Sequence, residues 1–252
     1  MGEFINGYLN PEIFADSFWL LLKTLPVVFE VLVLGLIFSY AWGLVLALLR
    51  LSRFRALRLL SGMYIDLFRG IPLLLLFVFI FYGLPLVGVR LDPFSSGVLG
   101  LTLCYGAYSA EIFRAGIQAI HKGQLEAARS LGMTAGQAMR YVILPQAIKL
   151  VIPPLTNEFI AMIKDTSLMS VITVPELLFT AKEKMGVVAN PTPLTVAAII
   201  YVIFTIPLIR LAARLETRRR KPRPPDMPAG ASNISPEAER DIHGADVAGQ
   251  MP

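Results

Sequence analysis

Charged residues are scarce in this chain. Only 16% of its 252 residues are Asp, Glu, Lys or Arg, and 55% are hydrophobic, whereas ordinary soluble domains carry roughly 25% charged residues. One soluble core of this length does not need so much apolar surface. The composition therefore excludes a soluble globular domain, and it equally excludes a chain that is disordered throughout.

Residues suited to catalysis or metal binding are also few. The one cysteine, Cys104, lies in an apolar run, which predicts a buried thiol and excludes a disulfide framework or a Cys-based metal site. Both histidines, His121 and His243, lie in polar stretches, away from any membrane-embedded nucleophile that a hydrolase would need. No G-x-x-x-x-G-K-[ST] segment for ATP is present. We expect no enzyme activity, cofactor or metal in this chain.

Long apolar runs, by contrast, are abundant. A helix needs about 20 apolar residues to cross a bilayer, and five runs approach this length, at about 24–48, 59–84, 94–113, 150–174 and 186–209. The fourth is the most polar, because it contains Glu158, Lys164 and Asp165. The sequence predicts an all-α integral membrane protein with five transmembrane helices.

The basic residues indicate the orientation of these helices. With the N-terminus outside, the cytoplasmic segments up to Arg223 hold sixteen Lys and Arg, and the two external loops hold only Arg90, Lys182 and Lys184. Short loops rich in Lys and Arg stay in the cytoplasm, so we expect an external N-terminus, a cytoplasmic C-terminus and placement in the cytoplasmic membrane. The net charge of +5 follows from these flanks and does not indicate nucleic acid as a partner.

The composition changes near residue 216. Residues 217–252 are rich in proline and charge and poor in large apolar side chains, so they cannot bury enough surface to fold. We expect a membrane domain over 1–216 and a disordered cytoplasmic tail over 217–252.

The loop of about 120–146 contains several residues that predict the ends of short helices. Residues 123–131 predict a two-turn helix that ends at Gly132. Thr134 and Gln137 have the spacing of a capping box, which starts a second helix. Two separately capped helices suit docking onto a partner, and an amphipathic linker on the membrane surface explains the spacing equally well.

Four ordered blocks resemble a known family. Glu126-Ala127-Ala128, Gly132 and the segment 142–145 (VILP) resemble the EAA loop of ABC importer membrane subunits. The segments 68–72 (FRGIP), 107–117 (AYSAEIFRAGI) and 157–168 (NEFIAMIKDTSL) resemble the polar amino acid branch, with its histidine, glutamine, arginine, glutamate and opine permeases. Two positions depart mildly: Val142 stands where the pattern prefers Ile, and Ile71 where the branch often has Thr.

The resemblance implies the permease subunit of an ATP-driven importer that moves a polar amino acid. In the family the EAA helix sits in a groove of an ATPase subunit, which assigns coupling to Glu126, Ala127, Ala128 and Gly132. It also implies that a separate ATPase binds ATP and Mg²⁺. The implied partners are a second permease, identical or homologous, two ATP-binding subunits, an external solute-binding protein, the amino acid and membrane lipid. The alternative is a self-powered secondary transporter or channel, against which stands the lack of an inverted repeat in the chain.

Ionisable residues inside the fourth apolar run indicate a binding site, because charges at bilayer depth are costly and usually face a cavity or a partner. Glu158 and Asp165 are seven residues apart, or about 700° on a helix, so they share one face. Two carboxylates on one face favour a cationic group of a substrate, and Arg69 is suited to its carboxylate. The alternative is that these charges pair among themselves, for instance Asp165 with Arg69.

Overall fold

The computed structural model describes residues 7–217, and every regular element in that range is a helix, which confirms the all-α prediction for this part of the chain. The predicted tail lies outside the described residues except for Thr217. Residues up to Ala213 group into one compact unit, which contains the core and the cavity described below, and a second unit begins at Arg214.

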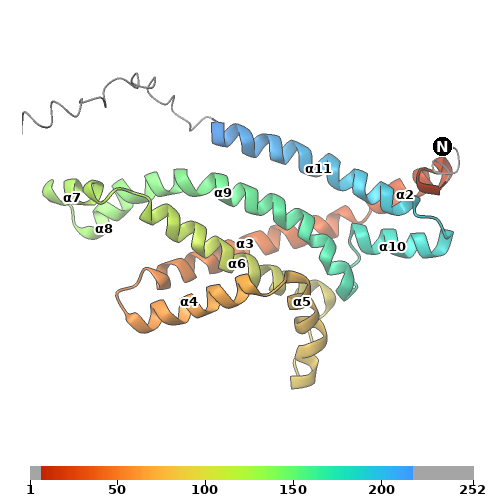
Figure 1. Cartoon of the computed structure of the whole chain (residues 1–252), viewed down its shortest axis with the longest axis horizontal. Helices are drawn as coiled ribbons and strands as arrows, with labels where there is room; N and C mark the ends of the chain where they lie inside the picture. Colours follow the sequence, from red (N-terminus) through yellow and green to blue (C-terminus); the bar gives the residue numbers. More distant parts are fainter. Residues whose placement is uncertain (1–6, 218–252) are drawn as a thin grey trace, which may run out of the picture. The chain divides into compact units, whose positions relative to one another are not determined.

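The elements in Figure 1 are α2 (Pro11–Leu22), α3 (Leu25–Arg50), α4 (Arg55–Gly70), α5 (Leu73–Val78), the π-helix η1 (Phe79–Gly83), the 3-10 helix η2 (Leu84–Val87), α6 (Pro93–Gln118), α7 (Lys122–Ser130), α8 (Ala135–Ala138), the π-helix η3 (Met139–Ile143), α9 (Leu144–Asp165), the 3-10 helix η4 (Thr166–Ile172), α10 (Leu177–Val188) and α11 (Thr192–Thr217).

Within residues 7–217, two helices are long and apolar enough to cross a membrane alone. These are α3 and the part of α11 over Thr192–Leu211. The segment from α4 through η2 qualifies as a third span if its two bent halves are taken together. Helices α6 and α9 have 26 and 22 residues, but ionisable side chains such as Glu111 and Glu158 interrupt their apolar surfaces. By length and composition alone, two helices, or three spans if the bent pair is counted as one, pass this test, and the count of five stays a prediction.

The predicted continuous helix over 59–84 is wrong, because the chain bends by 102° between α4 and the segment that begins at Leu73. Ile71 has an extended backbone and Pro72 follows it. A residue before proline disfavours the α conformation, and proline has no N–H to donate to the preceding turn. The break therefore has a local cause in the sequence.

Two further helix boundaries differ from the prediction. The run over 150–174 forms the end of α9, which begins at Leu144, and then the 3-10 helix η4. The run over 186–209 does not start one helix: α10 ends at Val188, and Ala189 adopts a left-handed φ of 47°. Pro191 precedes Thr192, where α11 begins. The predicted apolar run therefore contains a helix end at Val188 and a new helix start at Thr192.

The core is built on the close approach of α3 and α6, which form the most extensive helix pair. A methyl group at Gly43 of α3 would lie 2.7 Å from Cβ of Ser109 and 2.9 Å from the carbonyl oxygen of Gly106, both in α6. Only glycine at this position allows the two helices to approach so closely. Small residues have the same role in many pairs of membrane helices. Residue Leu101 of α6 and residue Met162 of α9 are fully buried beside this contact region.

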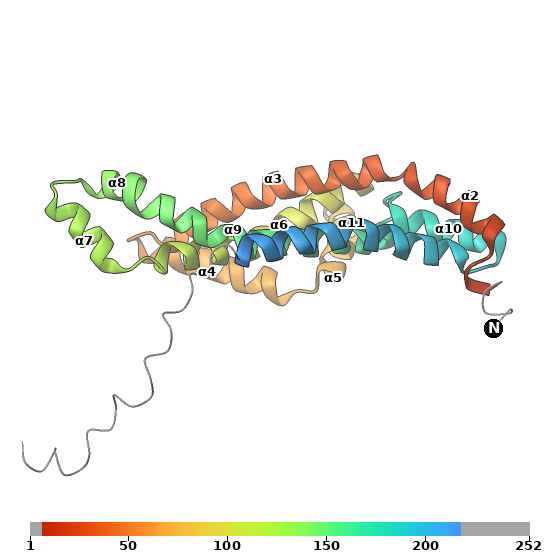
Figure 2. The same cartoon turned by 90° about the horizontal axis from the view of Figure 1, so that it is seen from above.

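Polar contacts hold α2, α10 and α11 together. The backbone N–H of Asn10 donates to Oγ1 of Thr192 at 3.2 Å, and Lys184 forms an ion pair with Asp16 at 3.6 Å. In Figures 1 and 2, α2 and α10 lie at one end of α9, and α7 and α8 lie at its other end. The helices of the predicted coupling loop are therefore remote from these contacts.

Candidate functional site

A cavity of about 660 Å³ lies where the break between α4 and α5 meets α6, α9 and η4. Its wall includes Gly70, Ile71 and Pro72 of the break, so the bend opens space for it. All three residues that were predicted to bind substrate line this cavity: Arg69 from α4 and the acidic pair Glu158 and Asp165 from α9. The structure thus brings together side chains that are far apart in the sequence.

Glu158 is buried, with 9% of its surface exposed. Oγ of Ser109 lies 3.0 Å from both oxygens of its carboxylate, and the same hydroxyl lies 2.7 Å from the carbonyl oxygen of Tyr105 one helical turn earlier. Because Gly43 packs against Ser109, a row of three residues, Gly43, Ser109 and Glu158, joins α3, α6 and α9. The position of Glu158 therefore depends on the packing of α3 against α6.

Asp165 bonds to a hydroxyl group rather than to a cation. The Tyr105 hydroxyl donates to Oδ2 of Asp165 at 2.8 Å. Among residues 7–217, neither Asp165 nor Glu158 takes part in an ion pair. The alternative that Asp165 pairs with Arg69 is therefore not what the structure contains.

Arg69 stands at the end of α4, immediately before the break. Its guanidinium carbon lies 5.3 Å from the ring centroid of Tyr108, and the Tyr108 hydroxyl donates to its carbonyl oxygen at 3.4 Å. Tyr108 thus contacts both the backbone and the side chain at the point where the helix stops. This leaves a positive group that no carboxylate neutralises by an ion pair within the described residues.

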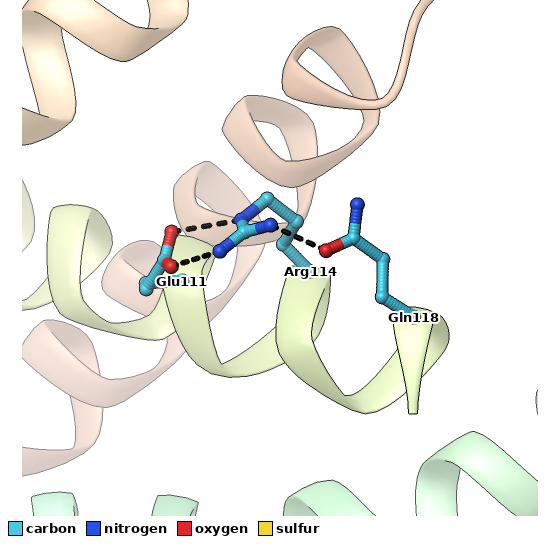
Figure 3. A network of polar contacts seen from close by, with 3 residues as sticks. All are labelled: Glu111, Arg114 and Gln118. Atoms are coloured by element: carbon cyan, nitrogen blue, oxygen red, sulfur yellow. Dashed lines mark hydrogen bonds and ion pairs between the residues drawn. The ribbon is translucent and has the colours of Figure 1, made fainter. Parts of the chain in front are cut away.

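A third carboxylate on the cavity wall, Glu111, is already paired. As Figure 3 shows, Arg114 binds the carboxylate of Glu111 with two nitrogens and donates with its third to the side chain of Gln118. This network occupies successive turns of α6. It leaves Glu158 and Asp165 as the carboxylates of the cavity wall that are open to another partner.

This arrangement suits a zwitterion. Two carboxylates on one wall attract an ammonium group, and a guanidinium on another can donate two parallel hydrogen bonds to a carboxylate. The tyrosine rings add apolar and cation–π surface for the rest of such a molecule. Within residues 7–217, no three His, Cys, Asp or Glu side chains lie together in a way that could hold a metal ion.

Tyr105, Tyr108 and Ser109 were not among the predicted site residues. Their spacings of one, three and four residues place them on one face of α6, and this pattern was the available signal. Lys164, beside Asp165, is exposed and does not line the cavity.

The predicted two-helix loop is present as α7 and α8. Gly132 has a φ of 83°, and Thr134 and Gln137 form both hydrogen bonds of the capping box. The start of α7 is capped by His121, whose Nδ1 accepts from the N–H of Gly123 at 3.1 Å. These features confirm the predicted local structure.

The alanines of this loop differ in exposure. Glu126 and Ala127 are exposed, but Ala128 is buried, as is Ala138 of α8. Ala128 therefore packs within the chain, and its predicted part in coupling stays a prediction.

The chain is similar to known transport proteins. Residues 39–221 match the family model described as binding-protein-dependent transport system inner membrane component. The probable glutamine ABC transporter permease protein GlnM of Bacillus subtilis (strain 168) is 38% identical over 218 residues, 84% of this chain and 99% of the relative. The L-cystine transport system permease protein TcyB of the same organism is 44% identical over 177 residues, 68% of this chain and 74% of the relative.

A solved structure gives the same result. A chain of the crystal structure of an amino acid ABC transporter with histidines superimposes with a TM-score of 0.72 at 39% identity, covering 82% of this chain and 94% of that one. The family match includes both the cavity and the loop of α7 and α8. Members of this family are membrane components of transport systems and not enzymes, which favours the importer over the self-powered alternative. The chain belongs to the family of binding-protein-dependent transport system inner membrane components.

Proposed function

We propose that this protein is the permease subunit of an ATP-driven importer and that it moves a polar amino acid across the cytoplasmic membrane. The observation that carries the proposal is the cavity in which Arg69, Glu158 and Asp165 meet. Relatives named for glutamine and L-cystine, and a solved amino acid transporter with histidines, support the same substrate class.

The proposed topology has five membrane crossings and an external N-terminus. The crossings are α3, the bent segment from α4 to η2, α6, α9 with η4, and α11. Glu158 and Asp165 of α9 line the cavity, and Glu111 of α6 pairs with Arg114, so these carboxylates are compatible with crossing. With this assignment the basic turn after α3, the loop of α7 and α8 and the end of α11 are cytoplasmic, as the distribution of Lys and Arg requires.

We assign coupling to the exposed surface of α7 and to the turn after it. Glu126 and Ala127 face outward, and Gly132 sets the angle between the two short helices. Ala128 contributes from inside by holding α7 in place. The partner at this surface is an ATPase subunit, which would bind ATP and Mg²⁺.

The assembly we propose contains a second permease subunit, two ATP-binding subunits and an external solute-binding protein. Five helices do not readily enclose a path for a solute, so two permeases must face each other. We expect the α-ammonium of the amino acid near Glu158 and Asp165 and its carboxylate near Arg69. A basic side chain would use the second carboxylate, so a cationic amino acid should benefit most from the pair.

The test is uptake by the reconstituted importer. Glu158→Gln and Asp165→Asn remove a charge with little change of shape, and each should raise the KM for uptake at least tenfold, more for a cationic substrate than for a neutral one. Lys164→Gln is the matched control, since this side chain is exposed beside Asp165 but outside the cavity. Both acidic variants should keep the bound ATPase. An unchanged KM in both would refute the site.

The single thiol provides a direct second readout. Cys104 lines the same cavity as the two carboxylates, and the chain has no other cysteine. A small membrane-permeant thiol reagent should label Cys104 more slowly when the transported amino acid is bound. If the amino acid leaves the labelling rate unchanged while uptake continues, the substrate binds elsewhere.

A further inference from the structure

The turn between α3 and α4 concentrates positive charge without neutralising it. Arg53, Arg55 and Arg58 are all exposed. No Asp or Glu occurs between Glu30 and Asp66, and within residues 7–217 none of these three arginines takes part in an ion pair. The nearest acidic residue on α4, Asp66, is eight residues after Arg58, or about 12 Å along the helix axis.

A fourth arginine fixes the shape of this turn. Arg50, at the end of α3, donates from its guanidinium to the carbonyl oxygen of Arg58 at 2.8 Å. The same guanidinium packs on Gly62 of α4, where any side chain would collide with it. The side chain of Arg50 therefore joins α3 to α4 and fixes the conformation of the turn. The other three arginines project from this turn into the surroundings.

An apolar row continues from the arginines along α4. Arg55, Leu59, Met63 and Leu67 follow one another at intervals of four residues, which places them on one stripe of the helix. The last three are large apolar side chains that are 62%, 62% and 56% exposed. This row extends about 18 Å from its positive end.

We propose that this surface, the arginine turn with the apolar row of α4, binds an anionic phospholipid. The arginines would hold the phosphate of the headgroup, and an acyl chain would lie along Leu59, Met63 and Leu67. Clusters of Lys and Arg on the cytoplasmic side of a membrane helix attract the anionic headgroups of lipids. A free phosphate ion would use the arginines but not the apolar row, which is why the structure favours a lipid.

This inference rests on the proposed function at one point, the cytoplasmic placement of the turn. Phe54 supports a position of the turn at the membrane surface. Its ring is 56% exposed, and the Arg53 guanidinium carbon lies 5.0 Å from the ring centroid. Phenylalanine and leucine side chains beside Lys and Arg are typical of amphipathic segments that lie in the membrane–water interface. The turn would therefore sit at the level of the headgroups.

The experiment measures retained lipid, not transport, so that its outcome is separate from that of the uptake test. The full chain is placed in nanodiscs of phosphatidylcholine with a minor fraction of phosphatidylglycerol, and native mass spectrometry counts the lipids that stay bound. We expect phosphatidylglycerol to be enriched at least tenfold over its fraction in the disc. The triple variant R53Q/R55Q/R58Q should bring this enrichment down to about one.

A matched control removes the same charge elsewhere. R218Q/R219Q/R220Q changes three arginines of the C-terminal flank and should retain the enrichment. If both triple variants lose it equally, the attraction is non-specific and the site is overturned. Inorganic phosphate at millimolar concentration should not displace the lipid, and displacement would turn the site into one for free phosphate.

The apolar row is tested without changing charge. L59S/M63S should lower the retained phosphatidylglycerol several-fold, with circular dichroism and elution volume showing that the chain is folded. If this variant instead keeps its lipid and converts a dimer to a monomer, the row is a subunit interface and the proposal fails.

Discussion

Glu176 is a carboxyl group that is almost fully shielded from solvent at the start of α10, with 1% of its surface exposed. Its oxygens accept from the backbone N–H of Leu178 at 2.8 Å, from that of Phe179 at 2.6 Å and from the hydroxyl of Tyr201 in α11 at 2.9 Å. One side chain thereby caps α10 and joins it to α11. Removing such a cap and leaving its partners unsatisfied costs about 1–3 kcal/mol.

This carboxyl group should make stability depend on pH. Burial raises the pKa of Glu176 above its ordinary value, and this outweighs its hydrogen bonds, which lower it. The folded state then binds more protons than the unfolded state, so the contribution is largest below the unfolded pKa of about 4.3 and is lost as the pH rises through the folded pKa. We expect the melting temperature in detergent to fall over that interval, and Glu176→Gln to flatten the profile.

Glu12→Gln is the control for this prediction, because Glu12 is exposed in the first turn of α2. It should leave the pH profile as in the unmodified protein. A Glu176→Gln profile that also matches the unmodified protein would show that Glu176 is ionised equally in the folded and unfolded states.

Among the helices, the turn between α7 and α8 depends on a single backbone conformation. Gly132 and Gly136 are both exposed, and a methyl group at either would meet nothing within 4 Å. They differ only in the backbone, since Gly132 has a φ of 83°, a left-handed conformation that costs other residues roughly 1–2 kcal/mol.

Gly132→Ala should therefore distort the turn and reduce the amount of ATPase subunit that co-purifies with the permease, by about fivefold or more. Gly136→Ala, within helix α8, should leave co-purification unchanged, because alanine favours a helix more than glycine does. Equal co-purification of the two variants would remove the turn from the coupling mechanism.

Local signals in the sequence were sufficient for this pair of helices but not for the bend before α5. Thr134, Gln137 and Gly132 act within a few residues of themselves, so their caps could be predicted from spacing alone. Pro72 was equally visible, but apolar residues on both sides of it concealed a bend of 102°. Hydropathy reports whether a segment is apolar and contains no information about its direction.

The sequence was sufficient to predict which site residues share a face of one helix, but not which residues of a neighbouring helix contact them. The spacing of Glu158 and Asp165 correctly placed them on one face of α9. Their partners Ser109 and Tyr105 come from α6, and which residues of α6 stand opposite α9 depends on how the helices pack. Gly43 of α3 helps to fix how α6 packs, and the residues around Gly43 in the sequence do not indicate which residues of α6 will face α9.

At the scale of the whole molecule, the proposed coupling surface lies at the end of α9 opposite to α2 and α10 (Figures 1 and 2). A change at Glu126 should thus affect assembly without affecting the fold of the remaining helices. Glu126→Arg reverses a charge that is exposed on α7, so we expect the ATPase subunit to be lost and uptake to stop. The protein should still reach the membrane in normal amount.

The comparison for this variant is Glu12→Arg, which makes the same charge reversal at the far end of the molecule. We expect ATPase co-purification and uptake to be retained there. Normal values of both for Glu126→Arg would assign the loop of α7 and α8 to the membrane surface, as an amphipathic linker.

The hydroxyl of Ser109 has one hydrogen and three acceptors within reach: the carbonyl oxygen of Tyr105 and both oxygens of Glu158. A single hydrogen serves one acceptor well at a time, so at every moment at least one oxygen of Glu158 is left for a different donor. An ammonium group arrives with three hydrogens and no lone pair, and it can fill that vacancy without competing for the serine. An ionised Glu158 thus has acceptor capacity that the serine does not fill, and a transported molecule with an ammonium group would supply the missing hydrogens.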